Sequence, residues 1–199
     1  MMLDSVPRWS VLVVDDHVPS RQALTAAIAH AGGRVVAESD SARAAPDLVA
    51  KVRPDVAVIA FGLGDGDGIA AAVSVQARAP CPVVLFTSHR DDDIIERAAA
   101  AGIMGFLLKP LRADEVAPVV DLARARFSEI QDLRQRLDAR KVIERAKGLL
   151  MARQGLSEEA AYRTLRDAAM NQRRPMGEIA RAVLVAAAVT PGDVGADRR

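Results

Sequence analysis

The chain has 199 residues, of which 50% are hydrophobic, 27% charged and only 3% aromatic, and its net charge is +1. This hydrophobic content excludes a chain that is disordered throughout, and the length allows one large domain or two small ones. A single cysteine, Cys81, excludes an internal disulfide and fits a reducing compartment. No apolar stretch reaches the ~20 residues needed to cross a bilayer, and the start of the chain lacks a signal-peptide core, so we expect a cytoplasmic protein with no membrane partner.

The charge is unevenly distributed. Residues 1–112 hold 11 Lys or Arg against 13 Asp or Glu, whereas residues 133–181 hold 12 against 6. A basic second half beside an acidic first half indicates a polyanionic partner for the second half only. A solvated helical surface rich in arginine would give the same balance, so charge alone leaves both interpretations open.

The first half alternates short apolar runs with helical stretches. Strands are predicted at 10–14, 34–38, 56–60, 82–86 and 105–108, and helices at 20–31, 42–51, 69–78 and 92–101. This alternation predicts an α/β fold with a doubly wound, five-stranded parallel sheet. In such a sheet the chemistry gathers at the carboxyl ends of the strands.

Polar side chains stand at these ends. Asp15 and Asp16 follow the first strand, Thr87 ends the fourth, and Lys109 follows the fifth. Adjacent carboxylates can hold a hard divalent cation, and a hydroxyl with an ammonium group can hold a phosphoryl group. With the runs Val-Val-Asp-Asp-His, Phe-Thr-Ser and Leu-Leu-Lys-Pro, and Phe106 at the family's aromatic switch position, residues 9–112 resemble a response-regulator receiver domain.

The resemblance implies a phosphoryl-accepting aspartate at the end of the third strand, but that position holds Ala60. Alanine has no carboxylate to form an acyl phosphate or to complete a metal shell. We therefore predict a receiver that is not phosphorylated at the usual position and a protein that is not an enzyme. Asp15 and Asp16 keep two ligands of a weak Mg²⁺ site, but we favour a remnant acidic cluster without a cofactor, in which Lys109 pairs with Asp15 or Asp16.

The nearest acids downstream of Ala60 are Asp65 and Asp67, in the run Gly64-Asp65-Gly66-Asp67-Gly68. Glycine at this density predicts a flexible turn. A carboxylate on such a loop would be poorly aimed for in-line phosphoryl transfer, which depends on positioning. We interpret these acids as turn residues rather than as a displaced acceptor.

A long linker helix is predicted from residue 113. Apolar residues recur in steps of three and four, and Val120, Phe127, Ile130 and Leu137 are the candidate dimerisation residues. This spacing predicts a short coiled coil and a homodimer. The alternative is a helix that lies on its own receiver.

The second half contains a recognisable motif. It runs Glu144-Arg-Ala-Lys-Gly-Leu-Leu-Met151, continues with Gly155-Leu-Ser-Glu-Glu-Ala160 and closes with Ala168-Ala-Met170. Ser157 can cap a second helix, with Glu158 and Glu159 in its first turn. Residues from about 136 to 184 resemble the ANTAR domain of bacterial transcription antiterminators. The resemblance implies a three-helix bundle whose dimers bind paired stem-loops in nascent RNA and prevent a terminator from forming.

Several basic residues and one aromatic residue are candidates for RNA contact. On the second helix of the bundle, Ala161, Leu165 and Ala168 are expected to be buried. Tyr162, Arg166, Ala169 and Arg173 are expected to form the neighbouring face, where an aromatic ring beside guanidinium groups can stack an unpaired base. The full candidate set is Arg140, Lys141, Arg145, Lys147, Tyr162, Arg166, Arg173 and Arg174.

The expected organisation is a tail (1–8), an atypical receiver (9–112), a linker helix with a short coiled coil (113–135), an ANTAR domain (136–190) and a second tail (191–199). The predicted function is RNA-binding transcription antitermination. Two alternatives stay open: a DNA-binding response regulator, and an interaction module that sequesters a sensor protein or kinase.

Overall fold

The structure is a computed structural model and describes residues 7–89 and 91–189. The predicted tail at 191–199 and most of the one at 1–8 lie outside the described residues. The chain divides into two compact units, Met1–Glu129 and Ile130–Arg199. Within the described ranges, no helix is both long and apolar enough to span a membrane.

The first unit is built on a five-stranded parallel sheet with strand order β2-β1-β3-β6-β7, which confirms the predicted α/β fold. Its strands are β1 (Ser10–Val14), β2 (Arg34–Ser39), β3 (Val56–Ala60), β6 (Val83–Thr87) and β7 (Gly105–Leu108). The inner strands β3 and β6 are buried at every residue, because helices cover both faces of the sheet. This explains their uninterrupted apolar sequences.

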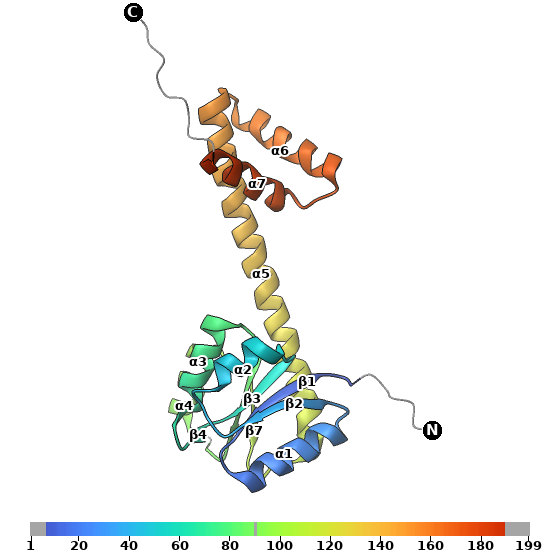
Figure 1. Cartoon of the computed structure of the whole chain (residues 1–199), viewed down its shortest axis with the longest axis vertical. Helices are drawn as coiled ribbons and strands as arrows, with labels where there is room; N and C mark the ends of the chain where they lie inside the picture. Colours follow the sequence, from blue (N-terminus) through green and yellow to red (C-terminus); the bar gives the residue numbers. More distant parts are fainter. Residues whose placement is uncertain (1–6, 90, 190–199) are drawn as a thin grey trace, which may run out of the picture. The chain divides into compact units, whose positions relative to one another are not determined.

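Helices lie on both faces of the sheet (Figure 1). One face is covered by α1 (Val18–His30) and the first part of α5 (Ala113–Gln154), and the other by α2 (Ala45–Val52), α3 (Gly68–Arg78) and α4 (Asp92–Ala100). Between β3 and α3 a small hairpin forms from β4 (Gly62–Leu63) and β5 (Gly66–Asp67). The hairpin was not predicted, since two-residue strands leave no periodic signal.

The start of α5 corrects one dimerisation prediction. Val120 has no exposed surface and packs in the receiver core with Val116 and Ala123. It cannot therefore contact a second chain. The sheet face beside α1 would otherwise be open to water, and α5 covers it. Farther along α5, Phe127 and Ile130 are half-buried, and the exposed fraction reaches 53% at Leu133 and 60% at Leu137.

Side chains near the start of the chain hold this part of α5 on the receiver. The indole Nε1 of Trp9 donates to Asp121 Oδ1 at 2.9 Å, and Arg8 pairs with the same carboxylate. Trp9 is 1% exposed and lies against Gly33, where an added Cβ would stand 2.3 Å from its ring. The contact therefore requires glycine at that position.

The second unit is all-α and consists of the remainder of α5, α6 (Glu158–Gln172) and α7 (Met176–Val189). Ser157 caps α6, since its hydroxyl accepts a hydrogen bond from the backbone N–H of Ala160 at 3.2 Å. The core is small and is formed from all three helices by Ala146, Leu150, Ala161, Leu165, Ala169, Ile179 and Ala180.

Candidate functional sites

A buried ion pair lies at the carboxyl edge of the sheet. Asp15 has no exposed surface, and its carboxylate accepts hydrogen bonds from Lys109 Nζ at 2.8 Å and from the backbone N–H of His17 at 2.9 Å. Lys109 Nζ also lies 4.6 Å from the ring centroid of Phe86. The predicted pairing of Lys109 with the acidic cluster is therefore present, and Asp15 is the partner.

The other expected pocket residues have partners of their own. The carboxylate of the exposed Asp16 accepts a hydrogen bond from the backbone N–H of Gly64 at 2.7 Å. Thr87 is buried and its hydroxyl accepts from the backbone N–H of His89 at 3.0 Å. Phe106 is half-buried against the core cluster on the side of α3 and α4.

Ala60 is the last residue of β3, the strand between β1 and β6. It is 1% exposed, and only a methyl group occupies its side-chain position. The chain returns very close to it: an added Cβ at Gly68 would stand 2.0 Å from the carbonyl oxygen of Ala60. Gly68 is thus required for this close approach of α3 to β3.

Asp65 and Asp67 are both held by the backbone, as turn residues would be. Asp65 accepts hydrogen bonds from the hydroxyl of Ser41 at 2.6 Å and from the backbone N–H of Ala42 at 2.8 Å, which lower the pKa of its carboxyl. Asp67 caps α3 by accepting from the backbone N–H of Ile69 at 2.7 Å. These contacts occupy both carboxylates.

The donor set does not fit the divalent cation that receivers use. Asp15 pairs with Lys109, Asp16 accepts from a backbone amide, and the side chain of Ala60 offers no oxygen ligand. Over residues 7–89 and 91–189, no group of three acidic, histidine or cysteine side chains could hold a metal ion. We therefore derive no chemistry through a metal at this edge.

In the second unit, Lys147 is nearly buried and forms two ion pairs. Only 9% of its side chain is exposed, and its Nζ donates to Glu144 at 3.0 Å and to Glu158 at 2.8 Å. These hydrogen bonds, the one to Glu158 foremost, raise the pKa of Lys147. Lys147 thus joins α5 to the first turn of α6, and its predicted contact with RNA stays a prediction.

The predicted face of Tyr162, Arg166 and Arg173 on α6 is also shorter than expected. The helix ends at Gln172, and Arg173 is its C-cap in the left-handed conformation, with a φ of 51°. The helical spacing between Tyr162 and Arg173, eleven residues apart, therefore does not place Arg173 on the face of Tyr162 and Arg166. Ala169 is buried instead of lining that face, which corrects its predicted position.

The remaining candidates are on the surface. Tyr162 is 42% exposed and lies one turn from the exposed Arg166 on α6. Lys141 and Arg145 are exposed one turn apart on α5, and a Cβ added at the nearby Gly148 would meet nothing within 4 Å.

Two further candidates differ in their surroundings. Arg140 is exposed on α5. Arg174 pairs with Glu178 at 3.0 Å, so part of its charge is offset.

The sequence interpretation missed one exposed apolar residue, Leu133. Leu133 was not among the candidate dimerisation residues, but it is exposed between Ile130 and Leu137 with spacings of three and four residues. These spacings were visible in the sequence. What the sequence hid was that the series before residue 124 belongs to the receiver core.

Comparison with known proteins matches both units to described families. Residues 11–121 match the response regulator receiver domain, and residues 131–184 match the ANTAR domain. The transcriptional regulatory protein PdtaR of Mycobacterium tuberculosis is 34% identical over 187 residues, which cover 90% of this chain and 91% of that protein. The nitrate regulatory protein of Klebsiella oxytoca is 46% identical over 66 residues, 32% of this chain and 17% of that protein.

Solved structures include similar receivers. The signal receiver domain of the response regulator NarL from Mycobacterium tuberculosis aligns with a TM-score of 0.56 and 31% identity. The alignment covers 60% of this chain and 98% of that domain. The chain therefore belongs to the response regulators, as a member that joins a receiver domain to an ANTAR domain.

Proposed function

We propose that the protein is an RNA-binding antitermination regulator whose ANTAR domain binds stem-loops in nascent transcripts. The support is the family match together with an exposed basic surface on the second unit. Arg140, Lys141 and Arg145 on α5 and Arg173 at the end of α6 are exposed. In the part of the chain that the structure describes, they form no ion pair.

The observation that carries this proposal is the exposed pair of Tyr162 and Arg166 on α6. A half-exposed phenol ring beside a guanidinium group is suited to stack an unpaired base and hold its phosphate. Arg166 has only a long contact of 3.6 Å with its neighbour Asp167, so it can turn toward a ligand. Contacts of Lys and Arg with phosphate would make the affinity depend on salt.

A gel-shift experiment tests the RNA assignment. The full chain is titrated against paired hairpin RNA and against duplex DNA of the same length at moderate salt, and we expect retardation of the RNA only. Arg166→Gln should weaken binding, with Arg181→Gln as the matched control, because Arg181 is exposed on α7 and is not among the candidate RNA contacts. Preference for duplex DNA would refute the proposal, and so would no binding of any nucleic acid.

We further propose that the receiver does not accept a phosphoryl group at the usual position, because Ala60 stands there. Incubation with a small phosphodonor, followed by intact-mass measurement, should leave the mass unchanged. The comparator is Ala60→Asp, which restores a carboxylate and should gain about 80 Da, the mass of one phosphoryl group. A stable adduct of that mass on the parent chain would show that another residue accepts the group.

We also propose that the protein is a homodimer paired through Ile130, Leu133 and Leu137 of α5. These apolar side chains follow one another in steps of three and four, and the last two are more than half exposed. This is the pattern of a coiled-coil seam. Light scattering should give a two-chain mass that falls to one chain in Leu133→Lys/Leu137→Lys, but not in the surface control Arg136→Glu. A one-chain mass for the parent would exclude this pairing.

A further inference from the structure

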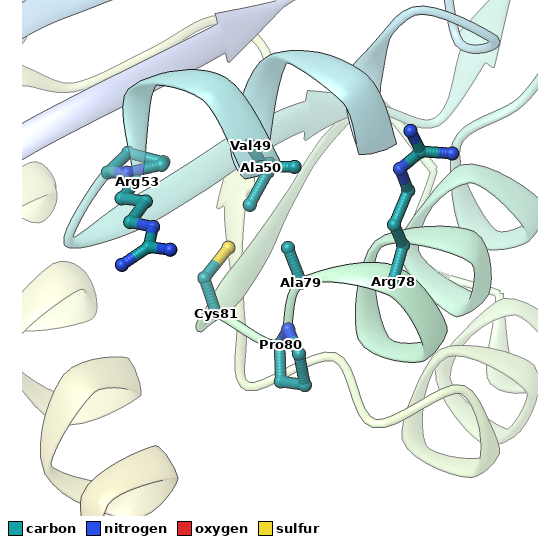
Figure 2. A pocket seen from close by; sticks show the side chains of 8 residues that line it. Val49, Ala50, Arg53, Arg78, Ala79, Pro80 and Cys81 are labelled. Atoms are coloured by element: carbon teal, nitrogen blue, oxygen red, sulfur yellow. The ribbon is translucent and has the colours of Figure 1, made fainter.

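A pocket of about 380 Å³ opens at the amino edge of the sheet, opposite the edge that carries Asp15 and Lys109. It lies where α2 and α3 end and where β3 and β6 begin (Figure 2). The pocket is lined by Val49, Ala50, Arg53, Pro54, Arg78, Ala79, Pro80 and Cys81. Its volume falls within the range of roughly 300–1,000 Å³ that is usual for small-ligand pockets.

The inner wall is apolar and stiff, whereas two arginines contribute polar surface. Val49 and Cys81 are 2% and 5% exposed and form the inner side, and Pro54 and Pro80 restrict the backbone of the two loops. The side-chain amide of Gln76 donates to the carbonyl oxygen of Cys81 at 2.8 Å and braces the loop that carries it. A pocket with such walls needs little rearrangement to accept a ligand.

The charges at the pocket are unequal. Arg53 and Arg78 stand at its two ends (Figure 2). Arg78 is engaged by Asp47 at 2.7 Å, which leaves its hydrocarbon stem toward the pocket. Within the described residues, Arg53 forms no ion pair. The pocket therefore combines an apolar inner wall with one cation that is available for an anionic ligand.

Arg53 is also held in an unusual backbone conformation. It is the C-cap of α2 and has a φ of 44°, in the left-handed region that glycine adopts without strain. A long basic side chain at such a position carries a conformational cost, and residues of this kind concentrate at ligand sites.

We propose that this pocket binds a small monocarboxylate with a hydrocarbon body, whose carboxylate pairs with Arg53. The hydrocarbon part would lie against Val49, Ala50 and Cys81, and the carboxylate would accept charge-assisted hydrogen bonds from the guanidinium group. The site is separate from both the Ala60 edge and the ANTAR surface. It goes beyond the proposed function, because binding here depends on neither RNA nor phosphorylation.

Calorimetric titration of the full chain with sodium octanoate tests the proposal, with 1-octanol as the uncharged control ligand. We expect one octanoate per chain, and weaker binding of octanol. Arg53→Gln should weaken octanoate binding about tenfold, as for loss of one charge-assisted hydrogen bond. The matched control is Lys51→Gln, since Lys51 is exposed in the last turn of α2 but does not line the pocket.

A second variant locates the ligand. Ala50→Leu places a larger apolar side chain in the pocket without altering its charge and should weaken octanoate binding, while the circular dichroism of the folded protein stays unchanged. Three results would overturn the proposal: no octanoate binding by the parent chain, equal weakening by the Arg53 and Lys51 substitutions, or undiminished binding to a folded Ala50→Leu variant.

Discussion

The ion pair at the carboxyl edge makes Lys109 a stabilising residue of the receiver, and Lys109→Met should expose that role. Methionine keeps most of the side-chain length but removes the cation that lies 2.8 Å from the carboxylate of Asp15. Asp15 has no exposed surface, so its charge would be left buried with only the backbone N–H of His17 as a partner.

The expected loss of stability follows from the burial of the two partners. Removing one member of a fully buried ion pair costs roughly 3–5 kcal/mol, whereas an exposed pair contributes roughly 0.2–1 kcal/mol. The Asp15 side chain is 0% exposed and the Lys109 side chain 26% exposed, so the pair lies between these limits. We expect a loss of about 2–3 kcal/mol, which lowers the Tm of a domain of this size by roughly 10 °C.

Tryptophan fluorescence in urea measures this loss directly. Trp9 is the only tryptophan of the chain and is buried in the receiver core, so its emission reports unfolding of that unit. Lys51→Met serves as the surface control. Adding Asp15→Asn to Lys109→Met should recover part of the stability, since the unpaired charge is then removed. If Lys109→Met unfolded at the same urea concentration as the parent, the ion pair would not stabilise the receiver.

Four other expectations follow from the described contacts. Leu165→Ala, at a site 1% exposed, should destabilise the ANTAR bundle by about 3 kcal/mol in thermal melts followed by circular dichroism. Lys147→Met should weaken RNA binding without changing its salt dependence, because Lys147 is paired with Glu158. Lys141→Met, by contrast, should flatten the slope of log K against log salt by about 0.7. A flatter slope for Lys147→Met would show that Lys147 also contacts phosphate. Burial raises the pKa of the Cys81 thiol to about 12. Iodoacetamide at pH 8 should therefore modify Cys81 only after urea is added, and rapid labelling of the native chain would contradict this expectation. A serine hydroxyl and backbone amides lower the pKa of Asp65. Its contribution to the free energy of unfolding is therefore present at neutral pH and is lost as the pH falls through that lowered pKa. In urea titrations at decreasing pH, Asp65→Asn should lose less stability in acid than the parent.

Much of the fold could be predicted because its signals are local. The apolar runs that became β3 and β6 are buried on both faces, and such strands need no alternation of polar residues. The acidic pair after β1 and Lys109 after β7 could be assigned to one edge, because parallel strands bring their carboxyl ends together. The assignment of Ala60 to the acceptor position stays a prediction, and it depends on the resemblance of one short segment to the receiver family.

The positions of several charged and apolar side chains were decided only by tertiary packing. Lys147 and a solvent-exposed lysine look alike in a helical sequence, and the difference is the carboxylate of Glu158, eleven residues away on another helix. Val120 fits a coiled-coil spacing, but the sheet face that buries it consists of strands far away in sequence.

The same applies to features with no periodic signal. The left-handed cap at Arg53 and the pocket beside it arise where two loops meet, and neither loop specifies the other. Sequence by itself thus determined the elements and the order of the two domains, because these depend on local pattern and motif. The packing of distant segments determined which cations face solvent, which apolar side chains remain exposed and where the chain is hollow, because burial depends on what covers a residue.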